Sequence, residues 1–390
     1  MMRVKIFLAC YLLVIVFLFF YSFTQVDLSL TLSRLSIYQT VEKYFQHIGY
    51  FQRPLSSGIY IVILLLLFAF YFLFLNSARK NLISRKQFWG IIILTTIILT
   101  FSYNAFSYDL FNYIFDAKIL THYHQNPYLH KALDYQTDPM LSFMHWTHRV
   151  YPYGPTWLSL TVPLSFFGSN FFLPTFFLFK TLIGASFLGT AFFIEKIIKR
   201  VSAKDSIFGL LFFALNPLVI IESLVSSHND IVMMFFALWG LYLFLNNKYF
   251  RGFLIFAASV GVKFATGFIL PVFAVMFALH KFKKKIDWGK ALIVILIFMS
   301  AAIVTASVRT NFQPWYLLYV LPFAAIISRK YFVFIPSIVL SLSSLILYIP
   351  FLYLGNWNPP VPTQLLWITT GGIAASVILT LAFKFKNLLE

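Results

Sequence analysis

Long apolar segments separated by short polar or basic breaks make up most of the chain. Residues 59–75 and 91–100, for example, contain no charged side chain. Because a helix needs about 20 mostly apolar residues to cross a hydrocarbon core about 30 Å thick, this pattern predicts an all-α, polytopic transmembrane protein. The apolar stretches predict spans near residues 6–24, 59–75, 88–104, 171–195, 206–224, 230–246, 290–308, 315–328, 331–353 and 364–383.

The composition agrees with this pattern and excludes an ordinary soluble domain. Of the 390 residues, 60% are hydrophobic and 11% are charged, against roughly 45–50% and about 25% in soluble domains. Thirty basic and twelve acidic residues give a net charge of +18. Most of the basic residues lie in the breaks between spans, and by the positive-inside rule those breaks face the cytoplasm. The charge therefore indicates orientation in a membrane and not a nucleic-acid partner, and it places both termini in the cytoplasm.

Residues 252–280 have basic residues at both ends, so both ends are expected on the cytoplasmic side. A single span cannot return to its own side. Two short helices that meet near Lys263 would do so, because about twelve residues at 1.5 Å each reach only about 18 Å. Gly261 and Gly267 flank the expected turn. With this hairpin the prediction is about 12 membrane segments.

The segment 105–170 is the long outer loop of this arrangement. Its N-terminal part is too polar to span a membrane, whereas residues 156–167 form a short apolar stretch between Pro155 and Gly168. We expect that stretch to be a helix lying at the membrane interface. Since neither an internal repeat nor a soluble domain is evident, residues 1–390 are expected to form a single integral membrane domain.

Acidic residues are scarce, and several of them gather in this outer loop. An ionised carboxylate at the centre of a membrane helix costs roughly 2.5–3.5 kcal/mol on insertion scales. Asp109 and Asp116 are seven residues apart and would share one face of a helix. A carboxylate at the membrane surface is suited to removing a proton from a substrate hydroxyl, with Asp109 as the general base and Asp116 as a supporting acid. The alternative is that Asp109 only caps the helix that follows it.

Other polar residues fall at the expected outer ends of spans and are candidates for a binding site. Tyrosines next to Pro152 and Gly154 would lie in a rigid turn suited to stacking on a sugar, although an aromatic belt at the interface explains tyrosines equally well. The remaining groups would serve equally as ordinary outer turns. The candidates are Asn126, Tyr128, Tyr151, Tyr153, Glu222, His228, Asp230, Gln313, Trp315 and Tyr316.

Two basic residues on the same side are candidates for binding a phosphate group. Lys263 lies at the apex of the expected hairpin, where it needs an anionic partner unless it snorkels to the interface. A lipid phosphate would satisfy it. Arg149 is the other, because a guanidinium pairs well with phosphate.

Five histidines between residues 122 and 148 leave a metal site open. None of their spacings matches a zinc motif such as H-E-x-x-H, and histidines in polar outer loops are often only solvated. The sequence requires no cofactor, and a divalent metal stays an alternative. The histidines are His122, His124, His130, His145 and His148.

The order of these motifs along the chain resembles that of membrane glycosyltransferases of the GT-C fold, and most closely the bacterial α-mannosyltransferases that use polyprenyl-phosphate mannose. The resemblance runs from about residue 100 to about residue 325 and rests on the order and sidedness of the motifs. These are Asp109, Tyr113, Asp116, Asn126-Pro127-Tyr128, Tyr151-Pro152-Tyr153-Gly154-Pro155, Asn216-Pro217 with Glu222, His228-Asn229-Asp230, Lys263 and Gln313-Pro314-Trp315-Tyr316.

The resemblance implies a glycosyltransferase in a bacterial cell membrane with its active site on the outer face. One sugar, mannose in the nearest relatives, would pass from a polyprenyl-phosphate donor to a hydroxyl of a glycan, glycolipid or protein acceptor, with inversion at the anomeric carbon. Asp109 would be the base, and Lys263, Arg309 and Arg149 would stabilise the departing phosphate. The polar candidates at the outer ends of the spans, among them Tyr151, Tyr153, His228 and Asp230, would line the sugar or acceptor pocket. A transporter or flippase for a lipid-linked sugar is the alternative, because broken helices and membrane-embedded charge also occur in transporters.

Overall fold

The computed structural model describes residues 2–389 and is built from helices joined by loops. Within these residues there is one isolated bridge, between Lys131 and Val150, and no strand. The all-α prediction is therefore confirmed. The elements run from α1 to α17, with seven short 3-10 or π elements between them.

Seven helical segments are long and apolar enough to cross a membrane, and an eighth is added if one bent pair is taken as a single span. The protein is thus an integral membrane protein, and the number of about 12 membrane segments stays a prediction. The segments are α1 with η1 (Met2–Tyr21 and Ser22–Gln25), α3 (Arg53–Arg79), α7 (Phe172–Val201), η6 with α12 (Phe264–Ile269 and Leu270–Lys281), α13 (Trp288–Thr310), α15 with α16 (Tyr331–Ile346 and Tyr348–Leu354) and α17 (Val361–Leu389). The bent pair is η4 with α8 (Ala203–Asp205 and Ser206–Ala214) followed by α9 with η5 (Pro217–Ile220 and Ile221–Val225).

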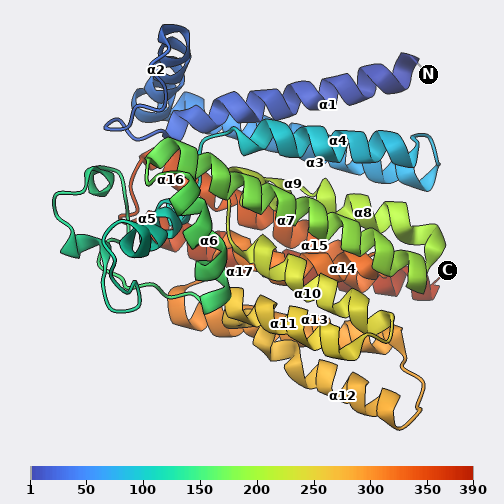
Figure 1. Cartoon of the computed structure of the whole chain (residues 1–390). Coiled ribbons are helices and arrows are strands. Elements are labelled where there is room, and N and C mark those ends of the chain that lie inside the picture. Colours follow the sequence, from blue (N-terminus) through green and yellow to red (C-terminus); the bar gives the residue numbers. More distant parts are fainter. Residues whose placement is uncertain (1, 390) are drawn as a thin grey trace.

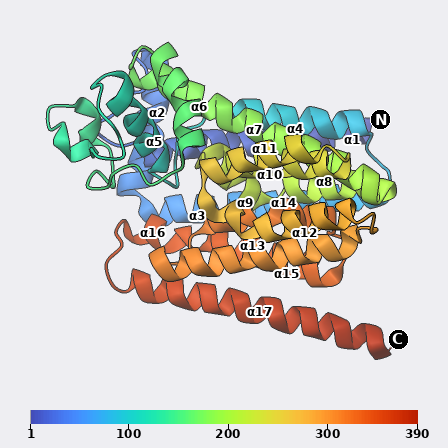
Figure 2. The ribbon, with the colours of Figure 1, turned by 60° about the horizontal axis from the view of Figure 1, so that its bottom comes forward.

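The long helices lie side by side, and the two ends of this bundle differ (Figure 1 and Figure 2). At one end, which we name the site end, lie α2 (Ser36–Phe51), α5 (Asp109–Thr121) and α6 (Pro155–Phe167). Both chain termini lie at the other end, which we name the opposite end. The bundle therefore presents a loop-rich face at the site end and short connections at the opposite end.

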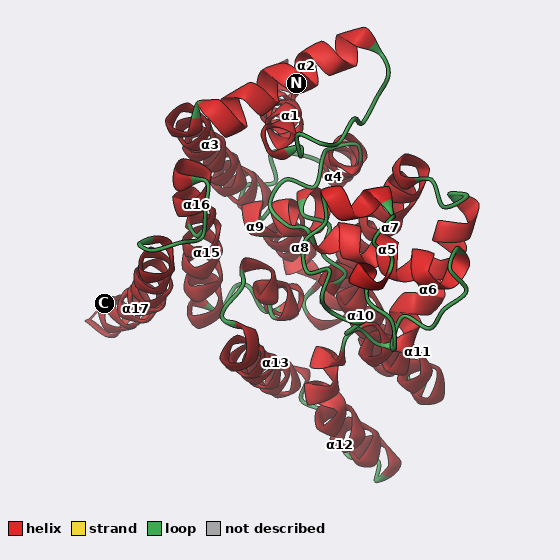
Figure 3. Ribbon diagram, turned by 90° about the vertical axis from the view of Figure 1, so that its left-hand side faces the viewer, coloured by secondary structure: helices red, strands yellow, loops and turns green. Residues whose placement is uncertain are grey.

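Helix α7 lies at the centre of the packing and contacts α4 (Arg85–Thr100), α8 and α10 (Asp230–Leu245). Residues 208–214 of α8 are all buried, as are most residues of α10. Viewed from the site end, α17 lies at the edge of the bundle beside α15 (Figure 3). Helices α8 and α10 are thus internal, as expected for helices that are hydrophobic on all sides.

The hairpin expected around Lys263 has its break at that residue. Helix α11 (Tyr249–Val262) ends immediately before Lys263, and η6 begins immediately after it. The second arm, Phe264–Lys281, has 18 residues, which makes it longer than the roughly twelve residues that the hairpin requires. The helix expected at residues 156–167 is α6.

Three of the predicted spans are not continuous helices. The span expected at 331–353 is interrupted only at Leu347, between α15 and α16. The span expected at 315–328 consists of η7 (Pro314–Tyr319) and the six-residue α14 (Leu321–Ile326), so the prediction of one helix there was wrong. A proline inside this stretch, Pro322, lacks the N–H that would continue the helix. The span expected at 206–224 bends by 55° at Asn216-Pro217 and ends in the π-helix η5.

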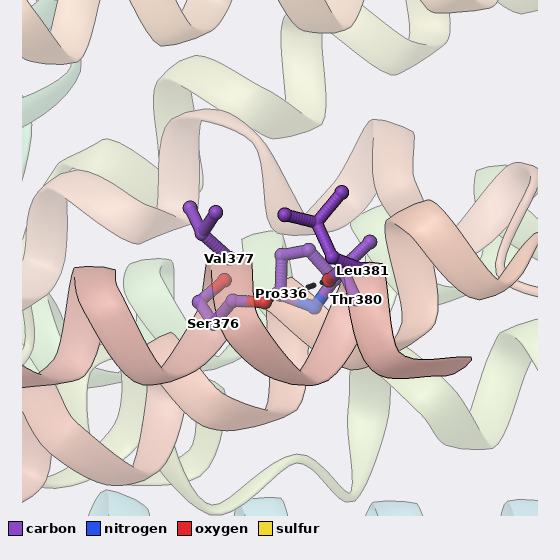
Figure 4. Close-up of a pocket in the computed structure, with 5 residues that line it drawn as sticks. All are labelled: Pro336, Ser376, Val377, Thr380 and Leu381. Carbon is purple, nitrogen blue, oxygen red and sulfur yellow. Dashed lines mark hydrogen bonds between the residues drawn. The ribbon is translucent and has the colours of Figure 1, made fainter. Parts of the chain in front are cut away.

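Two cavities open along the seam between α15, α16 and α17. The smaller has a volume of about 190 Å³ and is lined by Pro336, Ser376, Val377, Thr380 and Leu381 (Figure 4). The larger has a volume of about 500 Å³ and an apolar lining that includes Ile346, Tyr353, Gln364 and Trp367. Neither cavity is lined by a candidate site residue.

Candidate functional site

Asp109 is the first residue of α5, but its carboxylate does not cap the helix. The hydroxyl of Ser107 accepts the hydrogen bond from the Asp109 backbone N–H at 3.1 Å, and the N-cap residue, Tyr108, makes no side-chain cap bond. Asp109 Oδ2 instead lies 3.4 Å from His228 Nδ1, and the Asp109 side chain is 20% exposed. The Asp109 side chain therefore does not act as the cap of α5 and is free to face His228.

His228 lies between two carboxylates. Its Nδ1 faces Asp109, and its Nε2 lies 3.3 Å from Glu222 Oε2. Both separations are ion-pair distances, but neither contact has hydrogen-bond geometry, so both ring nitrogens lack a hydrogen-bond partner. The other Glu222 oxygen, Oε1, accepts a hydrogen bond from the Tyr348 hydroxyl at 2.8 Å. The result is a line of four side chains: Asp109, His228, Glu222 and Tyr348.

The backbone between α9 and α10 is irregular, and this irregularity places Glu222 and His228 together. The side chain of Asn216 accepts a hydrogen bond from Leu218 N, which starts α9 after the bend. Glu222 lies in the π-helix that follows, and π-helical turns are frequent at functional sites. Ser227 has a φ of 56°, a left-handed conformation that costs of order 1–3 kcal/mol in a residue other than glycine. This strained turn directs the His228 ring back towards Glu222.

Asp230 and Lys263 form the second charged group of the site. Lys263 Nζ lies 2.7 Å from Asp230 Oδ1, with Asp230 fully buried and the Lys263 side chain 21% exposed. The anionic partner that the sequence required for Lys263 is thus provided by the protein itself. The ammonium also lies within 6 Å of the ring centres of Tyr153, Tyr316 and Tyr319, a range in which the face of an aromatic ring attracts a cation.

The loop that contains Tyr153 is fixed to α11 by its backbone. Gly154 N donates to Val262 O at 3.3 Å, and a Cβ on Gly154 would lie 2.2 Å from Gly261 O. Only glycine permits this approach. Because Lys263 directly follows Val262, the contact brings the Tyr153 ring next to the lysine.

Buried polar atoms without a hydrogen-bond partner concentrate in this region. Of the 17 such side-chain atoms in the described residues, eight belong to residues 222–230. Buried polar groups in folded proteins are nearly always paired, so an unpaired group needs an explanation such as a ligand, a water molecule or a catalytic role. The residues concerned are Glu222, Ser223, Ser226, His228, Asn229 and Asp230.

The charges on α5 and on His228 are set by their neighbours. Burial by itself raises the pKa of Asp109, but His228, Lys263 and Arg149 together bring it below its usual value. Burial lowers the pKa of His228, and the two carboxylates beside it outweigh this and raise the pKa to about 9. Burial, with the charge of Asp109 added, raises the pKa of Asp116 well above its usual value. At neutral pH the site thus favours an ionised Asp109 beside an imidazolium, while the neutral form of Asp116 is favoured relative to a free aspartic acid.

Several other predicted site residues support the loop and do not reach the cluster. Asn126 Oδ1 accepts from Tyr128 N, and the Tyr128 hydroxyl donates to Tyr153 O at 3.3 Å. The buried Tyr151 donates to Gly154 O at 2.9 Å within its own turn. These contacts fix the shape of the turn that presents Tyr153.

Two of the three predicted phosphate ligands lie at the surface. The exposed Arg149 lies over the ring of Trp146 at 4.4 Å. Arg309 is exposed in the last turn of α13 and forms no hydrogen bond or ion pair with the described residues. Both guanidinium groups are therefore open to an anion.

The segment after Arg309 closes one side of the site. Gln313 precedes η7 and is partly buried. The Trp315 ring stacks on the His228 ring, with centroids 4.1 Å apart. The Tyr316 hydroxyl lies 2.6 Å from Thr310 Oγ1.

Sequence reasoning missed two residues that contact the site. Tyr348 lies in an apolar span and gives no signal in the sequence. Lys180 is buried inside α7 and donates to Ser102 O at 2.8 Å and to Ser102 Oγ at 3.0 Å, with Val225 O at 3.4 Å. A lysine within a membrane-length helix is itself a functional signal.

No metal ligand set is evident in residues 2–389. No group of three or more His, Cys, Asp or Glu side chains is placed there to hold an ion. In the outer loop, His145 stacks on Tyr108 at 3.7 Å, and His130 pairs with Asp134 at 3.6 Å. The metal alternative is left without a site among these residues.

A comparison with protein families matches residues 29–279 to the model described as alpha-(1->6)-mannopyranosyltransferase, N-terminal domain. The matched segment covers more than half of the chain and contains Asp109, Glu222, His228, Asp230 and Lys263. Neither a curated protein nor a solved structure matches the chain.

Proposed function

Because the chain belongs to the alpha-(1->6)-mannopyranosyltransferase family, a family of GT-C mannosyltransferases, we propose that it transfers a single mannose from a polyprenyl-phosphate donor to an acceptor hydroxyl. Membership of this family means that the protein is a glycosyltransferase, and its apolar helices are typical of a protein in a lipid bilayer. The donor, the acceptor and the roles of the residues are the content of the proposal. The acceptor is a primary hydroxyl of a glycan, glycolipid or protein.

The reaction inverts the anomeric carbon. The acceptor oxygen forms a bond to that carbon while the bond from the carbon to the phosphate oxygen breaks, and polyprenyl phosphate leaves with the electron pair. The acceptor proton passes to the Asp109 carboxylate. A β-linked donor then gives an α-mannoside, and a positioned base contributes typically 10² to 10⁴ to the rate.

The exposure of Asp109 is the observation that supports this assignment best. Asp109 is 20% exposed, whereas Glu222 and Asp230 are fully buried. A base must reach the acceptor hydroxyl directly or through one water molecule. Of these three carboxylates, Asp109 is the one that an acceptor can contact, and its lowered pKa keeps it ionised.

The departing phosphate needs positive charge, and the site end provides three cations. Lys263 keeps one-fifth of its side chain exposed while it pairs with Asp230, and Arg149 and Arg309 are exposed. Charge-assisted bonds from guanidinium to phosphate are roughly twice as strong as neutral ones. We assign the three residues to the donor phosphate, with Tyr153, Trp315 and Tyr316 beside the sugar. Asp116 is the supporting acid next to Asp109.

The site end faces away from the cytoplasm in this proposal. The clusters Lys281–Lys285 and Arg79–Lys80 lie at the opposite end, where both termini also lie. By the positive-inside rule that end is cytoplasmic. The acceptor then arrives from outside the cell membrane, and the lipid donor arrives through the bilayer.

The test is sugar transfer by Asp109→Asn in proteoliposomes supplied with polyprenyl-phosphate mannose. We expect the product to fall by about 10² to 10⁴, with folding unchanged because asparagine has the same shape. Asp134→Asn is the matched control, since Asp134 is an exposed carboxylate of the same loop, and it should transfer at the rate of the unaltered protein. Full transfer by Asp109→Asn would refute the assignment of the base. If the labelled donor crosses the bilayer without any transfer, the flippase alternative is correct.

A further inference from the structure

We propose that His228 is a positioning residue that holds Asp109 in the orientation and the charge state required of the base, and that Glu222 and Tyr348 hold His228. The proposal rests on the proposed function, because it needs Asp109 to be the base. It gives His228 and Glu222 a role behind the base in place of direct contact with the sugar or the acceptor.

Burial is the first argument. The side chains of His228 and Glu222 are both 0% exposed. The Trp315 ring stacks on the His228 ring with centroids 4.1 Å apart and so covers one face of the imidazole. A substrate therefore contacts Asp109 and Trp315 before it can contact the histidine.

The two ring nitrogens give the second argument. Nδ1 faces Asp109 Oδ2 at 3.4 Å and Nε2 faces Glu222 Oε2 at 3.3 Å. A doubly protonated ring donates to both carboxylates, whereas a neutral ring donates to one only. Catalytic hydrogen bonds are often long in a free enzyme and shorten when the substrate is bound. An imidazolium bound to Oδ2 leaves Oδ1 of Asp109 for the acceptor proton.

Glu222 is held from behind. Its Oε1 accepts from the Tyr348 hydroxyl at 2.8 Å, and its backbone oxygen accepts from His228 N at 3.1 Å. The Glu222 carboxylate beside Nε2 favours the charged form of the histidine, because an opposite charge within about 4–6 Å stabilises that form. The π-turn and the strained Ser227 fix the spacing between the two residues.

Charged and titratable groups from several elements face this line, and Tyr113 and Tyr153 lie close enough to Asp109 to interact with its charge. Asp109 is influenced by His228, Lys263 and Arg149, and it acts in turn on Asp116. His228 is influenced by Asp109 and Glu222. Glu222 faces Tyr348 and Tyr60. A change at His228 thus removes one of three cations from the surroundings of Asp109.

The experiment is the pH dependence of sugar transfer by His228→Gln in proteoliposomes. Glutamine keeps a hydrogen-bond donor and removes the positive charge. Because transfer needs ionised Asp109, activity is lost as the pH falls through the pKa of that carboxylate. Without the cation the pKa rises, so the acid limb should move to higher pH by about one unit. The maximal rate should fall by about 10- to 100-fold, less than for the loss of the base itself.

Glu222→Gln is the second variant, and it should move the alkaline limb of the pH profile of sugar transfer. It removes the carboxylate that keeps His228 protonated, so the histidine should lose its proton at lower pH, and the alkaline limb should move down. Glu195→Gln is the matched control, because Glu195 is an equally buried glutamate at the opposite end. Its pH profile should coincide with that of the unaltered protein.

The outcomes separate the two proposals. If Asp109→Asn is inactive and both His228→Gln and Glu222→Gln keep the limbs of the unaltered protein, the positioning role is wrong and the base assignment stands. If Asp109→Asn is active, the proposed function fails first. Should His228→Gln not yield folded protein, as judged by gel filtration in detergent, the alkaline limb of Glu222→Gln decides alone.

Discussion

Two buried glutamates, one near each end of the bundle, differ in how many partners their carboxylates have. Glu195 near the opposite end is 2% exposed, and it binds Arg85 at 2.5 Å, Lys199 at 2.6 Å and Trp89 at 2.9 Å. Glu222 near the site end is fully buried, and its carboxylate accepts one hydrogen bond, from Tyr348, while its second oxygen lies 3.3 Å from His228 Nε2 without hydrogen-bond geometry. Both carboxylates are buried to a similar degree, so burial does not explain the difference.

The difference lies in how many buried polar atoms the protein leaves without a hydrogen-bond partner. A charge taken out of water is stable only when other groups satisfy it, and Glu195 is satisfied on both oxygens by groups that join α4 to α7. In residues 222–230, by contrast, eight buried polar side-chain atoms have no hydrogen-bond partner. We infer that the opposite end is built for stability, while the site end keeps polar atoms ready for a substrate or for a positioned base.

The first prediction concerns which end faces outward, and its expected effect is all or none. In a protein with its one native cysteine replaced, Cys10→Ser, a cysteine at Gln125→Cys should react with an impermeant thiol reagent on intact cells. A cysteine at Lys284→Cys should react only after permeabilisation. Both positions are exposed, the first in the loop after α5 and the second in the loop after α12.

The reverse labelling pattern would place the site end in the cytoplasm and would refute the outward-facing site. Labelling of both positions in sealed cells would indicate leakage, and a cytoplasmic marker protein controls for it. The result does not depend on activity, so it tests sidedness separately from the roles of the residues.

Local features of the site end follow from the sequence more readily than its long-range pairs. The helix that begins at Asp109, the break at Lys263 and the helix after Pro155 are all expected from local signals, because proline, glycine and lone charges act on the backbone nearby. The contact between Glu222 and Tyr348 joins residues 126 positions apart. No local pattern encodes such a pair, since it depends on how α15, which leads into α16, packs against α9.

The pairing of Lys263 with Asp230 shows the same limit. The sequence indicates that the lysine needs an anion, and a lipid phosphate and an internal carboxylate both meet that need. The structure brings Asp230 to 2.7 Å because α10 and α11 pack against each other. The broken helix at residues 314–326 was missed for a related reason: its apolar composition fits a span, whereas its prolines interrupt the helix.

The second prediction breaks the charged pair near the site end. Lys263→Ala leaves the fully buried Asp230 without a cation, and removing one partner of a buried pair costs about 3–5 kcal/mol. The melting temperature should fall strongly, and donor saturation should require more polyprenyl-phosphate mannose. Thermal unfolding in detergent and transfer at varied donor concentrations measure the two effects.

The double variant Lys263→Met with Asp230→Leu separates stability from donor binding. It removes both charges, so most of the lost stability should return, while donor use should stay weak. Transfer at the normal rate by the double variant would restrict the pair to a structural role. Equal weakening of donor and acceptor use would argue against phosphate binding by Lys263.

The third prediction concerns the buried glutamate near the opposite end. Glu195→Gln removes charge-assisted bonds to Arg85 and Lys199, whose side chains are 53% and 41% exposed. Because water can solvate these cations once they are released, the free energy of unfolding should fall by only about 1.5–3 kcal/mol. Transfer at 25 °C should be unchanged. A loss of transfer without a loss of thermal stability would contradict the division between the two ends.

The fourth and smallest effect is expected at Asp116. Burial and the neighbouring Asp109 raise the pKa of this carboxyl, so the folded protein keeps a proton that the unfolded chain releases. Stability from this group is therefore complete at acid pH and decreases as the pH rises from about 4 towards the raised pKa, by about 1.4 kcal/mol for each pH unit between the unfolded and the folded pKa. Asp116→Asn keeps the shape and removes the titration, so its melting temperature should vary less between pH 5 and pH 8 than that of the unaltered protein. Asp134→Asn, at an exposed carboxylate of the same loop, should leave this pH dependence as it is. If Asp116→Asn behaves like that control, Asp116 is ionised in the folded protein and is not the supporting acid beside the base.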